Sequence, residues 1–193
     1  MGKSRLEAFS DGVIAIIITI MVLELKVPHG DDFHALAELL PVFGAYILSF
    51  VYVGIYWLNH HHMIHAVKKV SGGILWANLH LLFWLSLMPF TSGWMSESHF
   101  GATPVFLFAF NLFMAAVAYT ILQWRIVAAQ GDDSELLRAL GADIKGKISL
   151  LCYVAAMALT FVNVWLAVAL TVAVAAMWFI PDRRIEKMLG GAS

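Results

Sequence analysis

Charged side chains are scarce in this chain. Lys, Arg, Asp and Glu make up 13% of the 193 residues, whereas 61% are hydrophobic, and the mean hydropathy is +0.82. Soluble domains carry about 25% charged residues, so this composition is typical of an integral membrane protein. The net charge of -1 gives no support to nucleic-acid binding, which needs an excess of basic residues.

Cysteine and internal repetition are nearly absent as well. The single cysteine, Cys152, stands in an apolar run and excludes a disulfide within the chain. We find no internal sequence repeat, which argues against a transporter built from two related halves.

Long apolar segments dominate the sequence, at residues 9–25, 41–58, 74–90, 105–124 and 148–180. Because backbone polar groups must be satisfied within lipid and no strand alternation is present, we expect an all-α fold. As one helix, the last segment would be about 50 Å long, against a hydrocarbon core of about 30 Å, so we place a turn at 161–163. This predicts one domain, 1–193, with six transmembrane helices at about 6–25, 41–62, 73–94, 104–126, 146–162 and 164–180.

Basic residues gather on one side of these predicted spans. With a cytoplasmic N-terminus, eleven of the twelve Lys and Arg residues fall inside and only Lys26 falls outside. This bias matches the positive-inside rule and predicts that both termini are cytoplasmic. Residues 128–147 are predicted to form a short amphipathic helix on the same side.

The first apolar segment carries charge at its entrance, at Arg5 and Asp11. An ionisable residue inside a membrane span costs roughly 2.5–3.5 kcal/mol and usually marks a functional site. The end of the second span and the start of the third bring other polar residues to the same depth. We therefore predict an interhelical hydrogen-bond network, with Arg5 as the charge partner of Asp11; its members are Arg5, Ser10, Asp11, Trp57, Asn59, His60, His61 and Asn78.

An apolar stripe with one hydroxyl follows Asp11 along the first span, at Ile16, Thr19, Ile20 and Leu23. Spacings of three and four residues place these side chains near one face of a helix. Such a face is suited to line a narrow pore, in which an apolar constriction gates by dewetting. Stripes of this kind serve helix packing more often, so spacing alone leaves both interpretations open.

The histidine run at positions 60, 61, 62 and 65 suggests a metal-binding box. The remaining histidines do not supply the further boxes that such a membrane enzyme needs, and no carboxylate pattern completes a site. Ser10 and Asp11 are neighbours whose side chains project about 100° apart on a helix, so they do not form a hydrolase pair. We expect neither a metal site nor an enzyme.

The pattern Arg5, Phe9, Ser10, Asp11 at the start of the first span resembles the signature of the transmembrane protein 175 family, the prokaryotic relatives of the lysosomal potassium channel. The resemblance implies a homotetramer in a prokaryotic inner membrane, with the first helix of each subunit lining a potassium-permeable pore. It also implies a constriction at Ile16, further pore-facing positions at Thr19, Ile20 and Leu23, and a signature that holds the first helix to its neighbours.

The chain contains no Thr-Val-Gly-Tyr-Gly filter and no regularly spaced arginines of a voltage sensor. These absences argue against strong voltage gating. Together with the resemblance they imply a leak-like cation channel with moderate preference for potassium over sodium, with potassium as the permeant ion and no cofactor. The alternative is a proton-coupled secondary transporter that uses Asp11 and the cytoplasmic-side histidines. A structural membrane scaffold, which would carry no flux, is a third interpretation.

Overall fold

The computed structural model describes residues 2–130 and 143–179, and the secondary structure of these residues is entirely helical. The all-α expectation is confirmed for this part of the chain. Most of the predicted amphipathic helix at 128–147 lies outside the described residues. The helices are α1 (Lys3–Leu23), α2 (Phe33–Ala37), α3 (Leu40–His65), α4 (Gly72–Ser86), α5 (Met88–Glu97), α6 (Ala102–Gln130), α8 (Ile144–Leu159) and α9 (Val164–Phe179).

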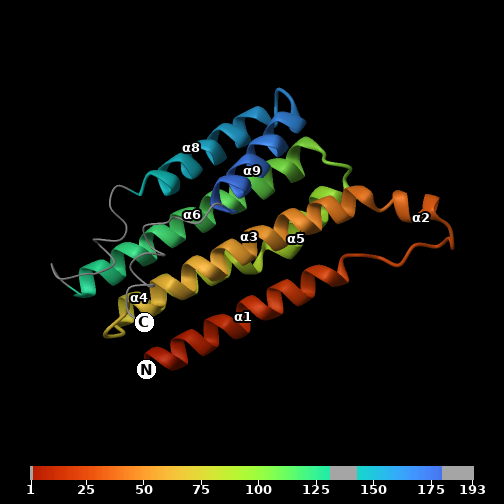
Figure 1. Cartoon of the computed structure of the whole chain (residues 1–193). Coiled ribbons are helices and arrows are strands. Elements are labelled where there is room, and N and C mark those ends of the chain that lie inside the picture. Colours follow the sequence, from red (N-terminus) through yellow and green to blue (C-terminus); the bar gives the residue numbers. More distant parts are fainter. Residues whose placement is uncertain (1, 131–142, 180–193) are drawn as a thin grey trace.

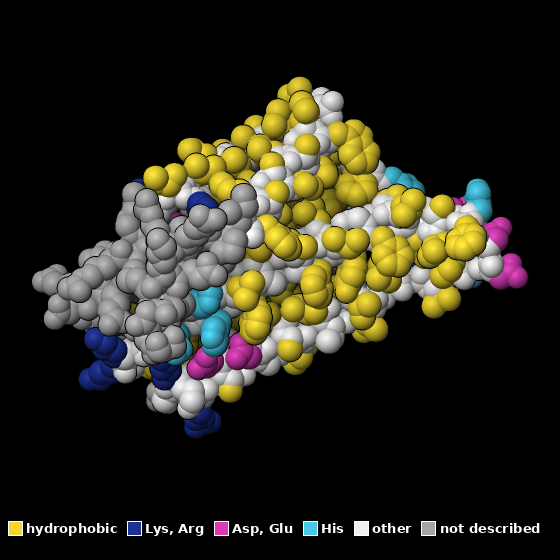
Figure 2. All heavy atoms as spheres, in the orientation of Figure 1, with side chains coloured by type: hydrophobic (Ala, Val, Ile, Leu, Met, Phe, Trp, Pro, Cys, Tyr) yellow, Lys and Arg dark blue, Asp and Glu magenta, His cyan; other side chains and the backbone are white. Residues whose placement is uncertain are grey.

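The long helices run side by side as one bundle, with α1 along one edge and α8 and α9 along the other (Figure 1). α6 packs against α4, α5, α8 and α9, while α3 packs against α1, α5 and α9. On the face shown in Figure 2, hydrophobic side chains cover the middle of the bundle. Lys and Arg gather at the end that carries the N-terminus, and acidic side chains mark the end at α2.

Within residues 2–130 and 143–179, four helical segments are long and apolar enough to cross a membrane: Lys3–Leu23, Leu40–His65, Gly72–Glu97 and Ala102–Ala129. The helices α8 and α9 contain 16 residues each, about 24 Å at 1.5 Å per residue. This is shorter than a hydrocarbon core of about 30 Å. The number of six spans therefore stays a prediction.

The third span is broken where α4 gives way to α5, at Leu87. Pro89 lacks a backbone N–H, so it cannot continue the helical hydrogen-bond pattern at this point. The hydroxyl of Ser92 donates to the carbonyl oxygen of Met88 at 2.8 Å and supplies a polar partner beside the break.

The long C-terminal apolar segment folds back between Leu159, where α8 ends, and Val164, where α9 begins. Asn163 stands directly before α9, and its Oδ1 accepts a hydrogen bond of 2.9 Å from the backbone N–H of Trp165. This is the geometry of a helix N-cap. The polar residue that marks the turn in the sequence therefore starts the next helix.

Candidate functional site

α1 has two faces of different character. Leu6, Ser10, Ile14, Ile17 and Met21 are buried, on the side where α1 contacts α3, α4 and α5. These residues follow one another at spacings of three and four, so they form one stripe of the helix. This stripe fixes α1 to the bundle and determines which residues face away from it.

The predicted pore stripe lies on the face that points away from the bundle. Ile16 is 58% exposed, Ile20 43% and Leu23 76%, and Thr19 is also exposed. The hydroxyl of Thr19 donates to the carbonyl oxygen of Ile16 at 2.9 Å. In a single chain, all four residues are therefore available to face other subunits, lipid or a pore.

A buried chain of hydrogen bonds ties the bundle side of α1 to α4 and α3. Asn78 Nδ2 donates to Ser10 Oγ at 3.0 Å, and Ser10 Oγ donates to the carbonyl oxygen of Leu6 at 2.9 Å. Asn78 Oδ1 lies 2.7 Å from His60 Nε2. An amide oxygen only accepts, so this contact assigns the His60 proton to Nε2. Ser10, Asn78 and His60 are at most 1% exposed.

Asp11 lies beside this chain, half-buried, and accepts a hydrogen bond of 3.0 Å from Trp57 Nε1. One turn earlier on α1, Glu7 Oε1 lies 3.4 Å from His61 Nδ1. His60 and His61 follow Trp57 by three and four residues on α3, so the three side chains share one face of the helix. Trp57 and His61 contact α1 from this face, and His60 contacts α4. The polar layer is defined here as Glu7, Ser10, Asp11, Trp57, His60, His61 and Asn78.

At the opposite end of α1, the connecting segment is held to α5. Lys26 Nζ lies 2.6 Å from Glu97 Oε1. The side chain of Glu24 packs closely against Gly93 of α5: a Cβ atom at position 93 would lie only 3.1 Å from Glu24 Oε2. The hydrogen bond to Glu97 raises the pKa of Lys26. Both members of the pair are exposed, so the pair contributes little to stability.

Comparison with known proteins identifies the family. A protein of Chryseobacterium sp. (strain P1-3), named as a potassium channel, is 55% identical over 189 residues, which cover 98% of each chain. This chain belongs to the TMEM175 family. The family model described as endosomal/lysosomal potassium channel TMEM175 matches residues 5–89, which include nearly all of α1, the whole of α2, α3 and α4, and the first two residues of α5.

The structural comparison agrees with this assignment. The crystal structure of a lysosomal potassium-selective channel TMEM175 homologue from Chamaesiphon minutus matches with a TM-score of 0.81 and 28% identity. It covers 92% of this chain and 96% of that one. The Gallus gallus endosomal/lysosomal proton channel TMEM175 is 34% identical over 115 residues, covering 51% of this chain and 23% of its own length. These relatives are channels, so this family member is not an enzyme.

Two predicted members of the TMEM175 signature region lie outside the polar layer. Arg5 is exposed, and the described residues of a single chain contain no ion pair between Arg5 and Asp11. Asp11 follows Arg5 by six positions, which places their side chains about 120° apart around a helix. Phe9 is 48% exposed and also points away from the packed side of α1.

Asn59 faces away from the polar layer as well. Its side-chain Nδ2 donates to the backbone carbonyl oxygen of Ile55 at 2.8 Å, and its backbone carbonyl oxygen accepts from Tyr119 OH at 3.4 Å. In the described residues, this side-chain hydrogen bond stays within α3 and does not link Asn59 to the predicted network with Asp11. Asn59 precedes His60 by one position, and this turns its side chain by about 100° toward α6.

The sequence-based prediction omitted one member of the polar layer, Glu7. Its signal was present, because Glu7 stands four residues before Asp11 and four-residue spacing places both carboxylates on one face of α1. Within the described residues, no group of three or more His, Cys, Asp and Glu side chains is arranged to hold a metal ion. The clustered histidines instead contact one another, with His61 and His62 ring centres 5.9 Å apart.

Proposed function

We propose that this chain is a potassium-permeable, leak-like cation channel with moderate preference for potassium over sodium. The observation that carries the proposal is the exposed apolar face of α1, with Ile16, Ile20 and Leu23, opposite a face that is fully packed. The naming of a relative with 55% identity as a potassium channel supports it. Potassium is the permeant ion in this proposal, and no cofactor takes part.

A single α1 cannot enclose a pathway, so the channel requires several copies of the chain around one axis. We propose a homotetramer in which α1 of each subunit lines the pore. Asp11 then stands near the cytoplasmic entrance, and Ile16 forms the apolar constriction, followed by Thr19, Ile20 and Leu23. An apolar constriction restricts passage to ions that shed or rearrange their water, and it replaces the carbonyl filter that this sequence lacks.

The polar layer keeps the pore helix in place. Ser10, Asn78 and His60 join α1, α4 and α3 through buried hydrogen bonds. Because an unsatisfied polar group inside a membrane protein is costly, the helices keep the register that satisfies all three side chains. This register determines the rotation of α1, and hence which residues face the axis.

The chain is proposed to lie in the inner membrane of a prokaryote with both termini cytoplasmic. The gathering of Lys and Arg at the end of the bundle that carries the N-terminus in Figure 2 supports this orientation, since short cytoplasmic segments are enriched in Lys and Arg. In this orientation the polar layer lies in the cytoplasmic half and the Lys26–Glu97 pair lies outside.

Proton-coupled transport is the second candidate, and the contact between Glu7 and His61 beside Asp11 favours it. These groups are able to exchange protons near one end of α1. The Gallus gallus relative is named as a proton channel. Turnover separates the candidates, because a channel passes ions much faster than an alternating-access cycle.

The test is flux of potassium and of sodium into liposomes that contain the purified protein. Ile16→Asn is expected to increase flux or reduce the preference for potassium, because a polar side chain wets the constriction. Ile47→Asn on α3 is the matched control, since Ile47 is 57% exposed and Ile16 is 58% exposed. Flux that is unchanged in Ile16→Asn, or that changes as much in Ile47→Asn as in Ile16→Asn, contradicts the pore assignment.

A further inference from the structure

A cavity lies between α3, α6, α8 and α9, on the side of α3 away from the polar layer. It is lined by Tyr52, Ile55, Tyr56, Asn59, Ala116, Tyr119, Thr120, Asp143, Gly146, Ser149, Tyr153 and Trp178. About 40 Å³ is open to the centres of water-sized molecules, which is room for about three waters. This size suits a ligand head group of a few heavy atoms.

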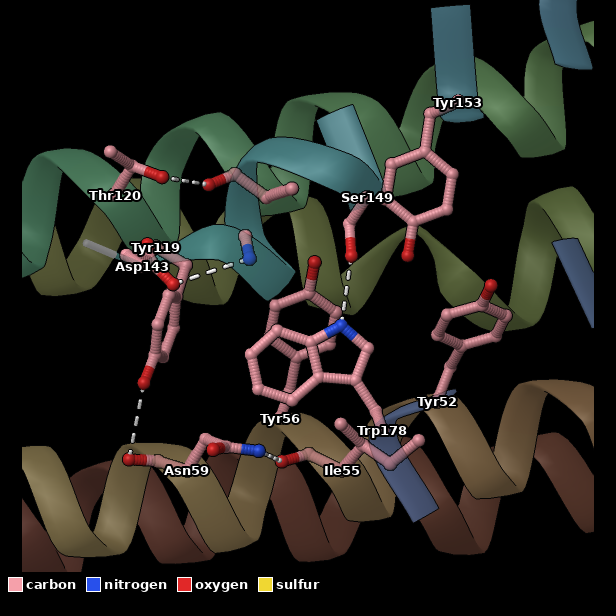
Figure 3. A pocket seen from close by; sticks show the side chains of 12 residues that line it. Tyr52, Ile55, Tyr56, Asn59, Tyr119, Thr120, Asp143, Ser149, Tyr153 and Trp178 are labelled. Atoms are coloured by element: carbon pink, nitrogen blue, oxygen red, sulfur yellow. Dashed lines mark hydrogen bonds between the residues drawn. The ribbon is translucent and has the colours of Figure 1, made fainter. Parts of the chain in front are cut away.

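Aromatic rings make up much of the cavity wall. Figure 3 shows the Trp178 indole in the middle of the view, with Tyr119 on one side and Tyr52 and Tyr153 on the other. The rings form pairs across helices: Tyr52 and Tyr153 have centroids 6.3 Å apart, and Tyr56 and Tyr119 have centroids 6.1 Å apart. The faces of tyrosine and tryptophan rings attract cations.

The polar groups of the lining have mostly used their hydrogen-bond donors within the protein. Trp178 Nε1 donates to Ser149 Oγ at 2.8 Å, and Tyr52 OH donates to the carbonyl oxygen of Thr171 at 2.6 Å. Ser149 Oγ, Thr120 Oγ1 and Asn59 Nδ2 donate to backbone carbonyl oxygens of their own helices. The surface that the lining presents to the cavity is therefore mostly apolar.

The charge carried by the lining residues is negative. Asp143 is the one ionisable carboxylate among the lining residues, and none of those residues is Lys or Arg. Asp143 Oδ1 accepts a hydrogen bond of 3.2 Å from the backbone N–H of Gly146 and caps α8. Lys145, outside the lining, places its Nζ 5.9 Å from the centroid of Trp178, so this indole already interacts with an ammonium group.

We propose that this cavity binds the ammonium head group of a small organic cation such as choline or ethanolamine. The aromatic rings surround the cationic head group, and Asp143 supplies the countercharge. Such a group is available either as a soluble amine or as the head group of a membrane lipid. The site lies on the side of α3 opposite α1, so it does not depend on the pore assignment.

Isothermal titration of the full chain in detergent with choline chloride tests the site directly. The neutral carbon analogue of choline, which has the same shape without the charge, is expected to bind at least about tenfold more weakly, because cation–π and charge-assisted contacts are lost. Equal binding of the two compounds, or no choline binding at millimolar concentration, overturns the proposal.

Variants locate the binding. Trp178→Leu and Asp143→Asn are each expected to weaken choline binding about tenfold, and Asn at position 143 retains a helix-capping side chain. Trp124→Leu, which replaces a 72% exposed tryptophan on α6, is the matched control and is expected to bind as the parent does. Choline affinity that survives both lining substitutions in folded protein places the binding elsewhere and overturns the assignment.

Lipid competition identifies the source of the ammonium group. If added phosphatidylethanolamine weakens choline binding and phosphatidylglycerol does not, the ligand is a lipid head group. If neither lipid competes, the ligand is a soluble amine. Both results support the cavity as an ammonium site, and neither depends on ion flux, so a failure of the channel proposal leaves this test intact.

Discussion

Asn78 shows how one side chain determines the rotation of a neighbouring helix. Its two polar ends serve different partners, with Oδ1 at His60 and Nδ2 at Ser10, and all three side chains are buried. Neither partner is replaceable by water, because the contacts lie inside the bundle. The orientation of α1 therefore depends on a side chain of α4.

Asn78→Ala is expected to lower the free energy of unfolding by about 1–3 kcal/mol, since it leaves a buried donor and a buried acceptor without partners. Denaturation of the purified protein in mixed micelles measures the loss. Asn59→Ala is the matched control, because in the part of the chain that the structure describes the side-chain hydrogen bond of Asn59 goes to the backbone of its own helix. A loss as large in Asn59→Ala as in Asn78→Ala would show that the bonds between helices are not the cause.

For single residues, the depth of a side chain in the membrane could be predicted from the sequence, but the direction in which it projects from its helix could not. The order of the apolar segments places Ser10, Asp11, His60 and Asn78 in one layer, and the structure brings them side by side. The same reasoning included Arg5, which points to another face of α1. Depth follows from hydropathy, whereas direction follows from how helices rotate against one another.

At the scale of elements, the turn between α8 and α9 depends on a single polar residue. Asn163 was predictable as a break because it is the one strongly polar side chain in its apolar segment, and the structure assigns it the N-cap of α9. The aromatic cavity was not predictable, because its wall combines side chains from four helices whose contacts hydropathy does not determine.

Asn163→Ala is expected to reduce stability by about 0.5–2 kcal/mol, because the first N–H groups of α9 lose their cap. Asn163→Asp keeps an acceptor oxygen and is expected to stay within a few tenths of a kcal/mol of the parent. Thermal unfolding of both variants in detergent, followed by helical circular dichroism, measures the difference. Equal losses in the two variants would mean that the cap does not stabilise α9.

At the scale of the whole molecule, the bundle leaves an apolar face of α1 without a partner in the described chain. Ile16 lies on that face, while Ile47 is equally exposed on α3. In a tetramer with α1 around the axis, copies of residue 16 approach one another at the constriction, whereas copies of residue 47 lie apart. The chain contains one cysteine, the half-buried Cys152, so cross-linking can be directed to chosen positions once it is replaced.

Ile16→Cys in a Cys152→Ser background is therefore expected to form disulfide-linked dimers when the membrane is treated with copper phenanthroline. The bond requires Cα atoms within about 7 Å, a distance that neighbouring copies reach only if α1 lines a narrow axis. Ile47→Cys in the same background is expected to remain monomeric on a non-reducing gel. Cross-linking at residue 47 but not at residue 16 would instead place α3 at the subunit interface and leave the apolar face of α1 against lipid.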